Sequence, residues 1–369
     1  MNPFRYGQVV SEIHYCHRPD LEKKLQAKLL SGQNTYIEGE RRTGKTSLIF
    51  RTVENMKSKW IMYIDLLEVK TVEDIHKRIL NGMAKASAGK NLLQNLIKNA
   101  AALRPVVSFD PISATPSVSI DTAIQLKPDS LEGVLDMFSD REFKNAVVAI
   151  DEFQDIKNLD NANQVLAVMR SKIQFLENIP IIFCGSIRNE MHLIFNDPDS
   201  PFFKSALPIE VGPIEREVFR EFIITKFTDN KRKISAPMVD RILEITGENP
   251  GDTQQLCSAL YDVSEPRTQI TEETLNEALR YLFAEERKGY EVQLARLTSI
   301  QLKCLTAVAR LGGKNTTSRD FIRATGVTHA TTIRKALSRH VELKILFNND
   351  GEYRFVNPFF ARWLVHVNY

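Results

Sequence analysis

The sequence predicts an α/β fold with a parallel sheet, followed by a region built mainly of helices. Up to residue 212, short apolar runs that end in polar residues alternate with amphipathic stretches of helical period. A glycine-rich loop joins the first of these runs to a helix. After Gly212-Pro213 the apolar runs give way to successive amphipathic helices.

The glycine-rich loop, Gly39-Glu-Arg-Arg-Thr-Gly44-Lys45-Thr46, fits the phosphate-binding pattern G-x-x-x-x-G-K-[ST]. The strand 34–38 precedes it and the helix 46–57 follows it, which is the context that this chemistry requires. Lys45 is expected to reach the β and γ phosphates and the Thr46 hydroxyl to bind Mg²⁺. The sequence therefore predicts an ATP and Mg²⁺ site whose loop residues are Gly39, Arg42, Thr43, Gly44, Lys45, Thr46 and Ser47.

A second motif ends the apolar run 146–150 with two carboxylates, Asp151 and Glu152. A buried parallel strand would open its carboxyl end onto the phosphate loop. Asp151 is expected to hold the Mg²⁺ through water, and Glu152 to orient or deprotonate the attacking water. Adjacent strand residues point to opposite faces, so the two carboxylates are given different roles.

Two further apolar runs, 60–65 and 179–186, are predicted strands, and 206–211 is expected to be the last one. Parallel strands would place Ser186 beside the two carboxylates, where it would sense the γ-phosphate or the water. A helix-capping serine is the alternative. Residues from about 80 to 130 are predicted to be an insertion, a helix near 91–103 followed by a β-hairpin.

Composition and charge limit the class of protein. With 369 residues, the chain exceeds the usual size of one core, so two or three domains are expected. The four cysteines are scattered without zinc or redox spacing, no signal peptide is recognisable, and no apolar run approaches membrane length, so a cytoplasmic protein is expected. Residues 296–369 carry a net charge of +8 and the preceding residues −5, which makes the basic end a candidate nucleic-acid surface.

The helices after residue 213 form two predicted domains. Four of them, within 213–290, suggest a small helical lid. Residues 291–369 are predicted to form three helices and a hairpin with an Asp-Gly turn, which is a winged-helix layout. Its recognition helix would present Arg334, Lys335 and Arg339 to DNA; docking of a protein partner is the alternative.

The chain resembles the archaeal-type ATPases of the STAND and AAA assemblage. The phosphate loop and the carboxylate pair are common to NTPases, whereas their combination with the break at 247–250 and the terminal Trp-Leu is specific to this group. The matching segments are Phe4-Arg-Tyr-Gly7, Arg18-Pro-Asp-Leu21, the loop 39–46, Asp151-Glu152, Cys184-Gly-Ser186, Gly247-Glu-Asn-Pro250 and Asn357-Pro-Phe-Phe-Ala-Arg-Trp363-Leu.

This resemblance implies a P-loop ATPase domain over 1–212 with strand order 5-1-4-3-2, then the lid and the winged helix, with ATP between sheet and lid. Arg18 and Pro19 would lie near the adenine, and Asn249 and Pro250 would approach the base or ribose. The Gly-Arg segment that often follows the sensor strand in such proteins is missing here. An arginine finger acting between copies of a homo-oligomer is therefore in doubt, with Lys204 or Arg188 as substitutes.

The expected function is an ATP-binding and ATP-hydrolysing switch, in which Lys45, Glu152 and Ser186 are catalytic and the winged helix binds double-stranded DNA. A signalling scaffold that turns ATP over slowly and docks a protein is the alternative. A kinase is disfavoured, since no pocket for an acceptor substrate can be identified.

Overall fold

A computed structural model describes residues 2–10, 12–86, 105–109, 116–120, 128–139, 143–186, 188–349 and 351–367. The chain forms two compact units. The sheet unit is Val9–Gly212, and the helical unit is Pro213–Tyr369 together with Met1–Gln8. The helix predicted near 91–103 lies outside the described residues.

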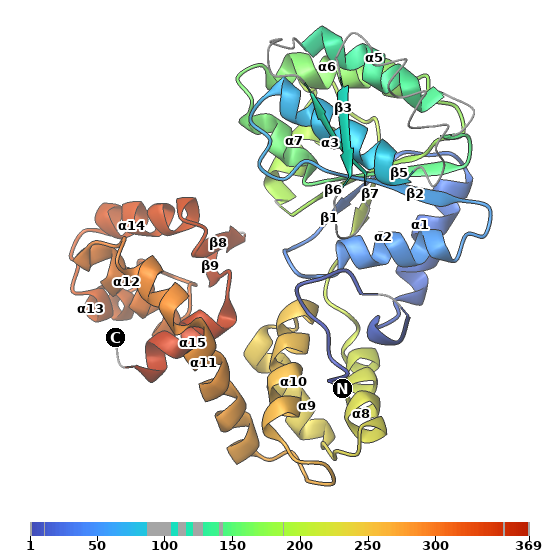
Figure 1. The fold of residues 1–369 in the computed structure, drawn as a ribbon. Coiled ribbons are helices and arrows are strands. Elements are labelled where there is room, and N and C mark those ends of the chain that lie inside the picture. Colours follow the sequence, from blue (N-terminus) through green and yellow to red (C-terminus); the bar gives the residue numbers. More distant parts are fainter. Residues whose placement is uncertain are drawn as a thin grey trace. The chain divides into compact units, whose positions relative to one another are not determined.

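The sheet unit is built on a five-stranded parallel sheet with the order β2-β5-β6-β1-β7 (Figure 1). Counted along the chain, these five strands lie in the order 2-3-4-1-5, which is the predicted order read from the other edge. The predicted fold class is thereby confirmed. The strands are β1 (Thr35–Glu38), β2 (Trp60–Asp65), β5 (Ala146–Asp151), β6 (Ile181–Gly185) and β7 (Leu207–Glu210).

Helices cover both faces of this sheet, which explains why its central strands are apolar without alternation. On one face, residues such as Val148 and Phe183 belong to a core shared with α3, α5, α6 and α7. On the other face, Ala149 and Ile182 pack in a core with α1 and α2. These helices are α1 (Pro19–Leu30), α2 (Lys45–Glu54), α3 (Val72–Ala86), α5 (Leu131–Asp136), α6 (Ala162–Ile173) and α7 (Arg188–Asn196).

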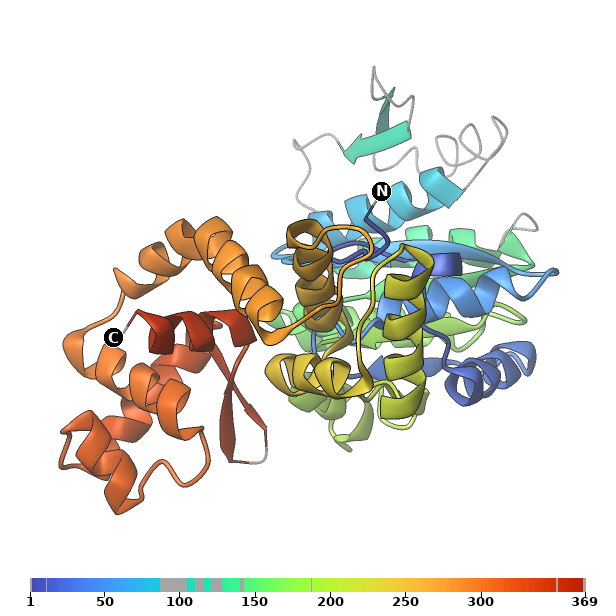
Figure 2. The ribbon, with the colours of Figure 1, turned by 90° about the horizontal axis from the view of Figure 1, so that it is seen from below.

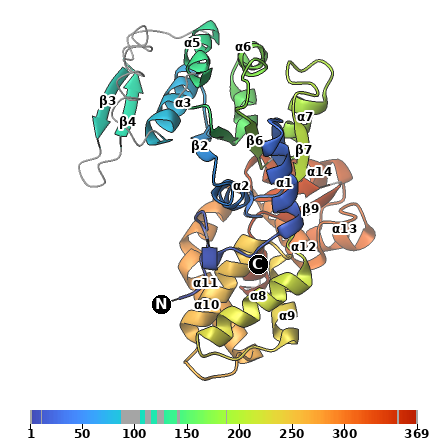
Figure 3. The same ribbon diagram turned by 90° about the vertical axis from the view of Figure 1, so that its right-hand side faces the viewer.

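Short elements complete the sheet unit. The strands β3 (Pro105–Phe109) and β4 (Pro116–Ile120) pair antiparallel in the predicted insertion, and β4 runs beside α3 (Figure 3). The described part of this unit also contains the short 3₁₀ helices η1 (Glu12–His14), η3 (Pro128–Ser130), η4 (Met137–Ser139) and η6 (Phe153–Asn158). The last of these directly follows the carboxylate pair.

The helical unit begins with four helices: α8 (Arg216–Asp229), α9 (Ala236–Thr246), α10 (Pro250–Val263) and α11 (Glu272–Leu294). The sequence-based boundary assigned the first residues to the sheet domain, whereas here they lie on these helices. The Asn2 amide donates to the Ser258 carbonyl at 3.1 Å, and the rings of Phe4 and Phe227 lie 4.8 Å apart. Burial of Phe4 attaches the start of the chain to this unit.

A winged-helix arrangement follows: α12 (Ser299–Leu311), α13 (Arg319–Thr325), α14 (Ala330–Glu342), β8 (Leu346–Asn349), β9 (Glu352–Phe355) and α15 (Pro358–His366). The two strands form an antiparallel hairpin that projects beside these helices (Figure 2). Gly313 contacts the second strand closely, because a Cβ placed there would lie 1.7 Å from the Tyr353 carbonyl oxygen. The terminal helix was not predicted; Asn357 caps it through bonds from Phe359 and Phe360 backbone N–H groups.

Candidate nucleotide-binding site

The phosphate loop connects the end of β1 to the start of α2, and its two glycines serve different purposes. Gly44 caps the helix with φ of 86°, in the left-handed region that favours glycine. Gly39 is required by close packing instead, since an added Cβ would lie 2.4 Å from the Val211 carbonyl oxygen. Arg42 also has a positive φ, of 65°. The loop is thus held in a tight turn at the helix N-terminus, where anions are stabilised.

Lys45 and Thr43 are bound to the loop itself. The Lys45 ammonium donates to the carbonyl oxygens of Gly39 at 3.0 Å and Glu40 at 2.8 Å, and its side chain is buried. The Thr43 hydroxyl donates to the same Glu40 carbonyl at 2.8 Å. These contacts hold the cation inside the loop, where it can bind a phosphate oxygen.

Asp151 lies at the carboxyl end of β5 and is buried. One of its carboxylate oxygens, Oδ2, accepts from the Thr46 hydroxyl at 2.9 Å and from the Tyr63 hydroxyl at 2.6 Å. Burial, with the Asp151 charge as a further cause, raises the pKa of Tyr63, so the phenol remains a donor at neutral pH. Sequence reasoning missed Tyr63, which reaches Asp151 through the pairing of β2 with β5.

The pairing of Thr46 with Asp151 fits Mg²⁺. This ion takes hard oxygen ligands, typically one or two carboxylates together with phosphates and waters. Among the described residues there is no group of three or more His, Cys, Asp or Glu side chains able to hold a metal by themselves. The Thr46 hydroxyl and the Asp151 carboxylate are the oxygens that would hold a bound Mg²⁺.

Glu152 lies one residue beyond the strand, with φ of 48° in the left-handed region. Because the strand ends at Asp151, the alternation of side chains along a strand does not set the direction of Glu152, as the sequence had suggested. Its Oε2 accepts from the Ser186 hydroxyl at 2.9 Å and from the Gln154 amide at 2.5 Å. The structure thus brings Ser186 beside the carboxylates, as the parallel strands predicted. Sequence reasoning missed Gln154.

Arg18 binds the loop region from the start of α1. Its guanidinium donates to the carbonyl oxygens of Thr43 and Gly212, both at 2.9 Å. Burial lowers the pKa of Arg18 from its usual value. Pro19 occupies the first turn of the helix, where its missing N–H costs nothing. The Ser47 hydroxyl oxygen, in turn, accepts from the Val10 N–H at 3.1 Å.

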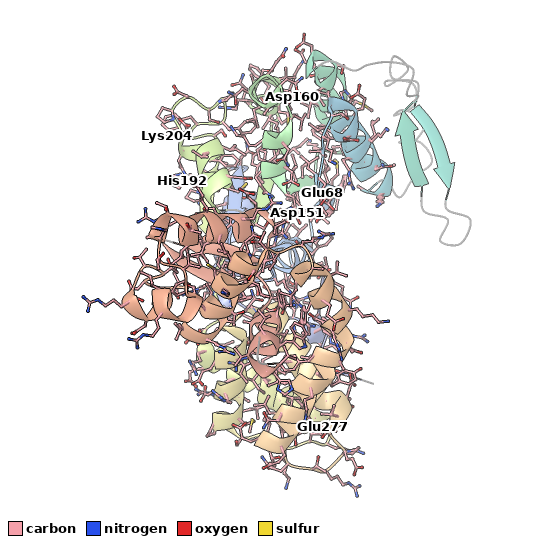
Figure 4. All side chains as sticks on the ribbon, turned by 90° about the vertical axis from the view of Figure 1, so that its left-hand side faces the viewer. Glu68, Asp151, Asp160, His192, Lys204 and Glu277 are labelled. Atoms are coloured by element: carbon pink, nitrogen blue, oxygen red, sulfur yellow. The ribbon has the colours of Figure 1, made fainter. Side chains whose placement is uncertain are left out.

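Other predicted residues lie elsewhere in the fold. Asn249 and Pro250 belong to the helical unit, where the Asn249 side chain caps α10 through the Gly251 and Asp252 N–H groups. Lys204 precedes β7 and therefore lies near the amino ends of the strands, whereas Asp151 lies at the carboxyl end of β5; Figure 4 labels both residues. Arg188 begins α7, just beyond Ser186, and its side chain lies outside the described part.

Comparisons with solved structures match this architecture. The Walker-type ATPase PABY2304 of Pyrococcus abyssi is 18% identical, with 95% of this chain and 96% of that chain covered and a TM-score of 0.63. Two Aeropyrum pernix proteins follow. ORC2, in its ADPNP–ADP complexes, is 14% identical over 95% and 91% of the two chains, with a TM-score of 0.52. ORC1, in complex with DNA, is 12% identical over 96% and 94%, with a TM-score of 0.51.

The chain has the fold of an archaeal Walker-type ATPase. Residues 288–366 also match the family model described as a probable winged helix domain. A search of curated protein sequences gave no match. The ATPase fold and the winged helix are therefore established by independent comparisons, one of structure and one of sequence.

The winged helix of this ATPase fold presents cations on α14. Arg334, Lys335 and Arg339 are exposed, while Ile333 and Leu337 are buried on the other face of the helix. Arg339 is paired with Glu342 on the same helix at 2.7 Å.

Among the described helices, none is long and apolar enough to cross a membrane.

Proposed function

We propose that this protein binds Mg²⁺-ATP, hydrolyses it, and uses the nucleotide state as a switch for its winged helix. The observation that carries the proposal is the convergence of six side chains near the carboxyl ends of the strands. Lys45 lies in the phosphate loop, Thr46 is bonded to Asp151, and Glu152 is bonded to Ser186 and Gln154. This arrangement offers a cation that can bind the phosphates, a metal site and a general base.

In the proposed reaction, a water oxygen forms a bond to the γ-phosphorus as the bond to the ADP oxygen breaks. Glu152 orients the water and accepts its proton, and Lys45 stabilises the negative charge on the phosphate oxygens. Bound Mg²⁺ would neutralise further charge on the same oxygens. Ser186 holds the Glu152 carboxylate from the neighbouring strand.

The decisive test of the site is Lys45→Ala, assayed by equilibrium binding of ATP and by release of γ-phosphate. Loss of the cation should weaken binding at least about 100-fold, or about 2.7 kcal/mol. Lys24→Ala is the matched control, because Lys24 is an exposed lysine on α1 of the same unit. Binding by the Lys45 variant as tight as that of the native chain would refute the proposed site.

For the adenosine, we propose that Arg18 and Pro19 lie near the base and that Asn249 and Pro250 approach it from the lid. Arg18 is already bonded to the Thr43 carbonyl in the phosphate loop, which supports its assignment to the nucleotide site. For the lid residues the support is the ATPase fold itself. In a homo-oligomer, Arg188 or Lys204 of one copy would act on the nucleotide of the next.

We propose that the switch controls binding of double-stranded DNA by the winged helix. Its support is the +8 charge of residues 296–369, the three exposed cations of α14, and the likeness to an ORC1 protein whose structure was solved with DNA. The switch would act as a regulator, or as a component of a mobile element or of defence.

Within the helical unit, one residue ties the lid to the winged helix. Glu286 on α11 accepts from Gln255 of α10 at 2.7 Å, and from Asn357, the cap of α15, at 2.7 Å. Tyr290 donates to the same carboxylate at 2.5 Å. A movement of α10 on ATP binding would therefore be transmitted to the helix that closes the winged helix.

A slow-turnover signalling scaffold is the second candidate, with the winged helix docking a protein. The buried residues Phe359, Phe360, Trp363 and Leu364 on α15 favour a firmly packed module that can serve either purpose. Salt-dependent affinity for a DNA duplex distinguishes the two, since binding through phosphates weakens steeply with salt.

A further inference from the structure

We infer that Gln154 is a positioning residue, which holds Glu152 in the orientation needed to activate water. This inference rests on the proposed hydrolysis of ATP and names a residue that the phosphate-loop and carboxylate motifs do not include. Gln154 lies in the 3₁₀ helix η6, which follows the carboxylate pair, and only 1% of its surface is exposed.

The amide of Gln154 has a fixed orientation. Its nitrogen donates to Glu152 Oε2 at 2.5 Å and to Asp155 Oδ1 at 3.1 Å, so both N–H groups are directed at carboxylates. Rotating the amide by half a turn would place its oxygen against the same two carboxylates. Asp155 is itself held, because its Oδ2 accepts from the Glu68 N–H at 2.7 Å.

The carboxylate of Glu152 is thereby held from two sides. Ser186, from the end of β6, and Gln154 both donate to Oε2. Within the described residues, the side-chain bonds to Glu152 converge on that oxygen, which leaves Oε1 for the attacking water of the proposed reaction. Without these donors, a glutamate outside the regular strand would have free rotamers, and misplacing a reacting group by 1 Å can cost about 100-fold in rate.

The cost of burying Gln154 indicates that the residue serves more than packing. Its Oε1 is buried without a hydrogen-bond partner among the described residues. Such an oxygen costs about 1–3 kcal/mol, which an apolar side chain would avoid. The neighbouring Gly185 leaves space for this oxygen, since a Cβ there would lie 2.4 Å from it. The presence of an amide at this position is therefore explained by the hydrogen bond that its nitrogen donates to Glu152.

The test compares Gln154→Met with the native chain in two measurements, the dissociation constant of Mg²⁺-ATP and single-turnover release of γ-phosphate. Methionine is close to glutamine in size and cannot donate. Turnover should fall about 10- to 100-fold, while the dissociation constant changes less than about threefold. Gln174→Met is the matched control, because Gln174 is an exposed glutamine whose amide donates to the Ser171 carbonyl at 3.3 Å.

A double-mutant cycle with Glu152→Gln separates positioning from mere structural support. If Gln154 acts through Glu152, then Gln154→Met should leave the residual turnover of the Glu152→Gln variant unchanged. A further drop in that background, an unchanged turnover in the native background, or a parallel loss of ATP affinity would each overturn the inference.

Gln154→Glu provides a second variant of equal size, in case the methionine variant does not fold. It replaces the donor by a second acid beside Glu152, and the same loss of turnover with retained binding is expected. Loss of turnover in Glu152→Gln with native turnover in both Gln154 variants would leave the ATPase proposal intact and overturn this inference alone. A native chain that releases no phosphate would overturn both.

Discussion

Thr46 and Asp151 are 105 residues apart in the chain and are joined by a hydrogen bond of 2.9 Å between Thr46 Oγ1 and Asp151 Oδ2. The bond exists because α2 starts, and β5 ends, at the same edge of the parallel sheet. The fold of the protein therefore brings together two oxygens that suit Mg²⁺.

Asp151→Asn should remove most of the gain in ATP affinity that Mg²⁺ provides. The amide keeps the size of the side chain but loses the charge that attracts the cation. We expect the ratio of ATP affinities with Mg²⁺ and with EDTA to fall at least about tenfold, or about 1.4 kcal/mol. Asp160→Asn, at a site away from Asp151 in Figure 4, is the control. An unchanged ratio would remove Asp151 from the metal site.

Glu152→Gln should separate binding of ATP from its hydrolysis. The substitution removes the base and leaves Asp151, Thr46 and Lys45 in place. ATP should bind with native affinity, while phosphate release falls by the roughly 10²–10⁴-fold typical of general-base catalysis. Native turnover in this variant would show that another group activates the water, and Ser186→Ala would be the next variant to measure.

The sequence predicted those parts of the site that local patterns define. The phosphate loop and Asp151 follow from a motif and from the end of an apolar strand, and the structure places them together. Tyr63 and Gln154 could not be predicted in the same way. Tyr63 reaches Asp151 through the pairing of β2 with β5, and Gln154 reaches Glu152 because the chain turns into the left-handed region there. The first contact depends on tertiary register, and the second on a local turn that no motif marks.

Gly313→Ala should destabilise the winged helix. An added Cβ would lie 1.7 Å from the Tyr353 carbonyl oxygen, a backbone atom that cannot rotate away. The cost should be about 2 kcal/mol or more, measured as the free energy of unfolding in urea. Gly289→Ala is the control, because a Cβ in that part of α11 meets nothing within 4 Å and alanine favours a helix. Equal effects of the two changes would contradict the close contact.

His340 should make the helical unit sensitive to acid. Burial lowers the pKa of His340 below its usual 6.5, with the bond between Nε2 and the Gln301 carbonyl opposing the shift. The unfolded chain therefore takes up a proton at a pH where the folded chain does not. The stability that neutral His340 contributes is complete above about pH 6.5 and is lost as the pH falls toward the folded pKa.

His340→Gln should flatten this dependence, because glutamine stays neutral and can still donate to the Gln301 carbonyl. The measurement is the free energy of unfolding between pH 7.5 and 5.5, compared with the native chain. His329→Gln is the control, since His329 is an exposed imidazole at the start of the same helix. A slope that His340→Gln leaves unchanged would assign the acid sensitivity to other groups.

Changing Arg334, Lys335 and Arg339 together to Gln should weaken duplex binding and flatten its salt dependence. The three cations are exposed on α14, whose other face is buried. Each phosphate contact that is lost should lower the slope of log affinity against log salt by about 0.9, so the slope should fall by about 2–3. ATP hydrolysis without DNA should stay native, because the nucleotide residues Lys45 and Glu152 lie in the sheet unit.

A matched control removes the same charge from α11, at Arg280, Arg287 and Lys288, which are also exposed. Arg287 is paired with Glu291 at 2.7 Å, as Arg339 is with Glu342, so each set contains one cation in an ion pair on its own helix. If both triple variants weakened binding equally, net charge rather than α14 would be responsible. A native chain that bound no duplex at low salt, with or without ATP, would instead favour the winged helix as a protein-docking module.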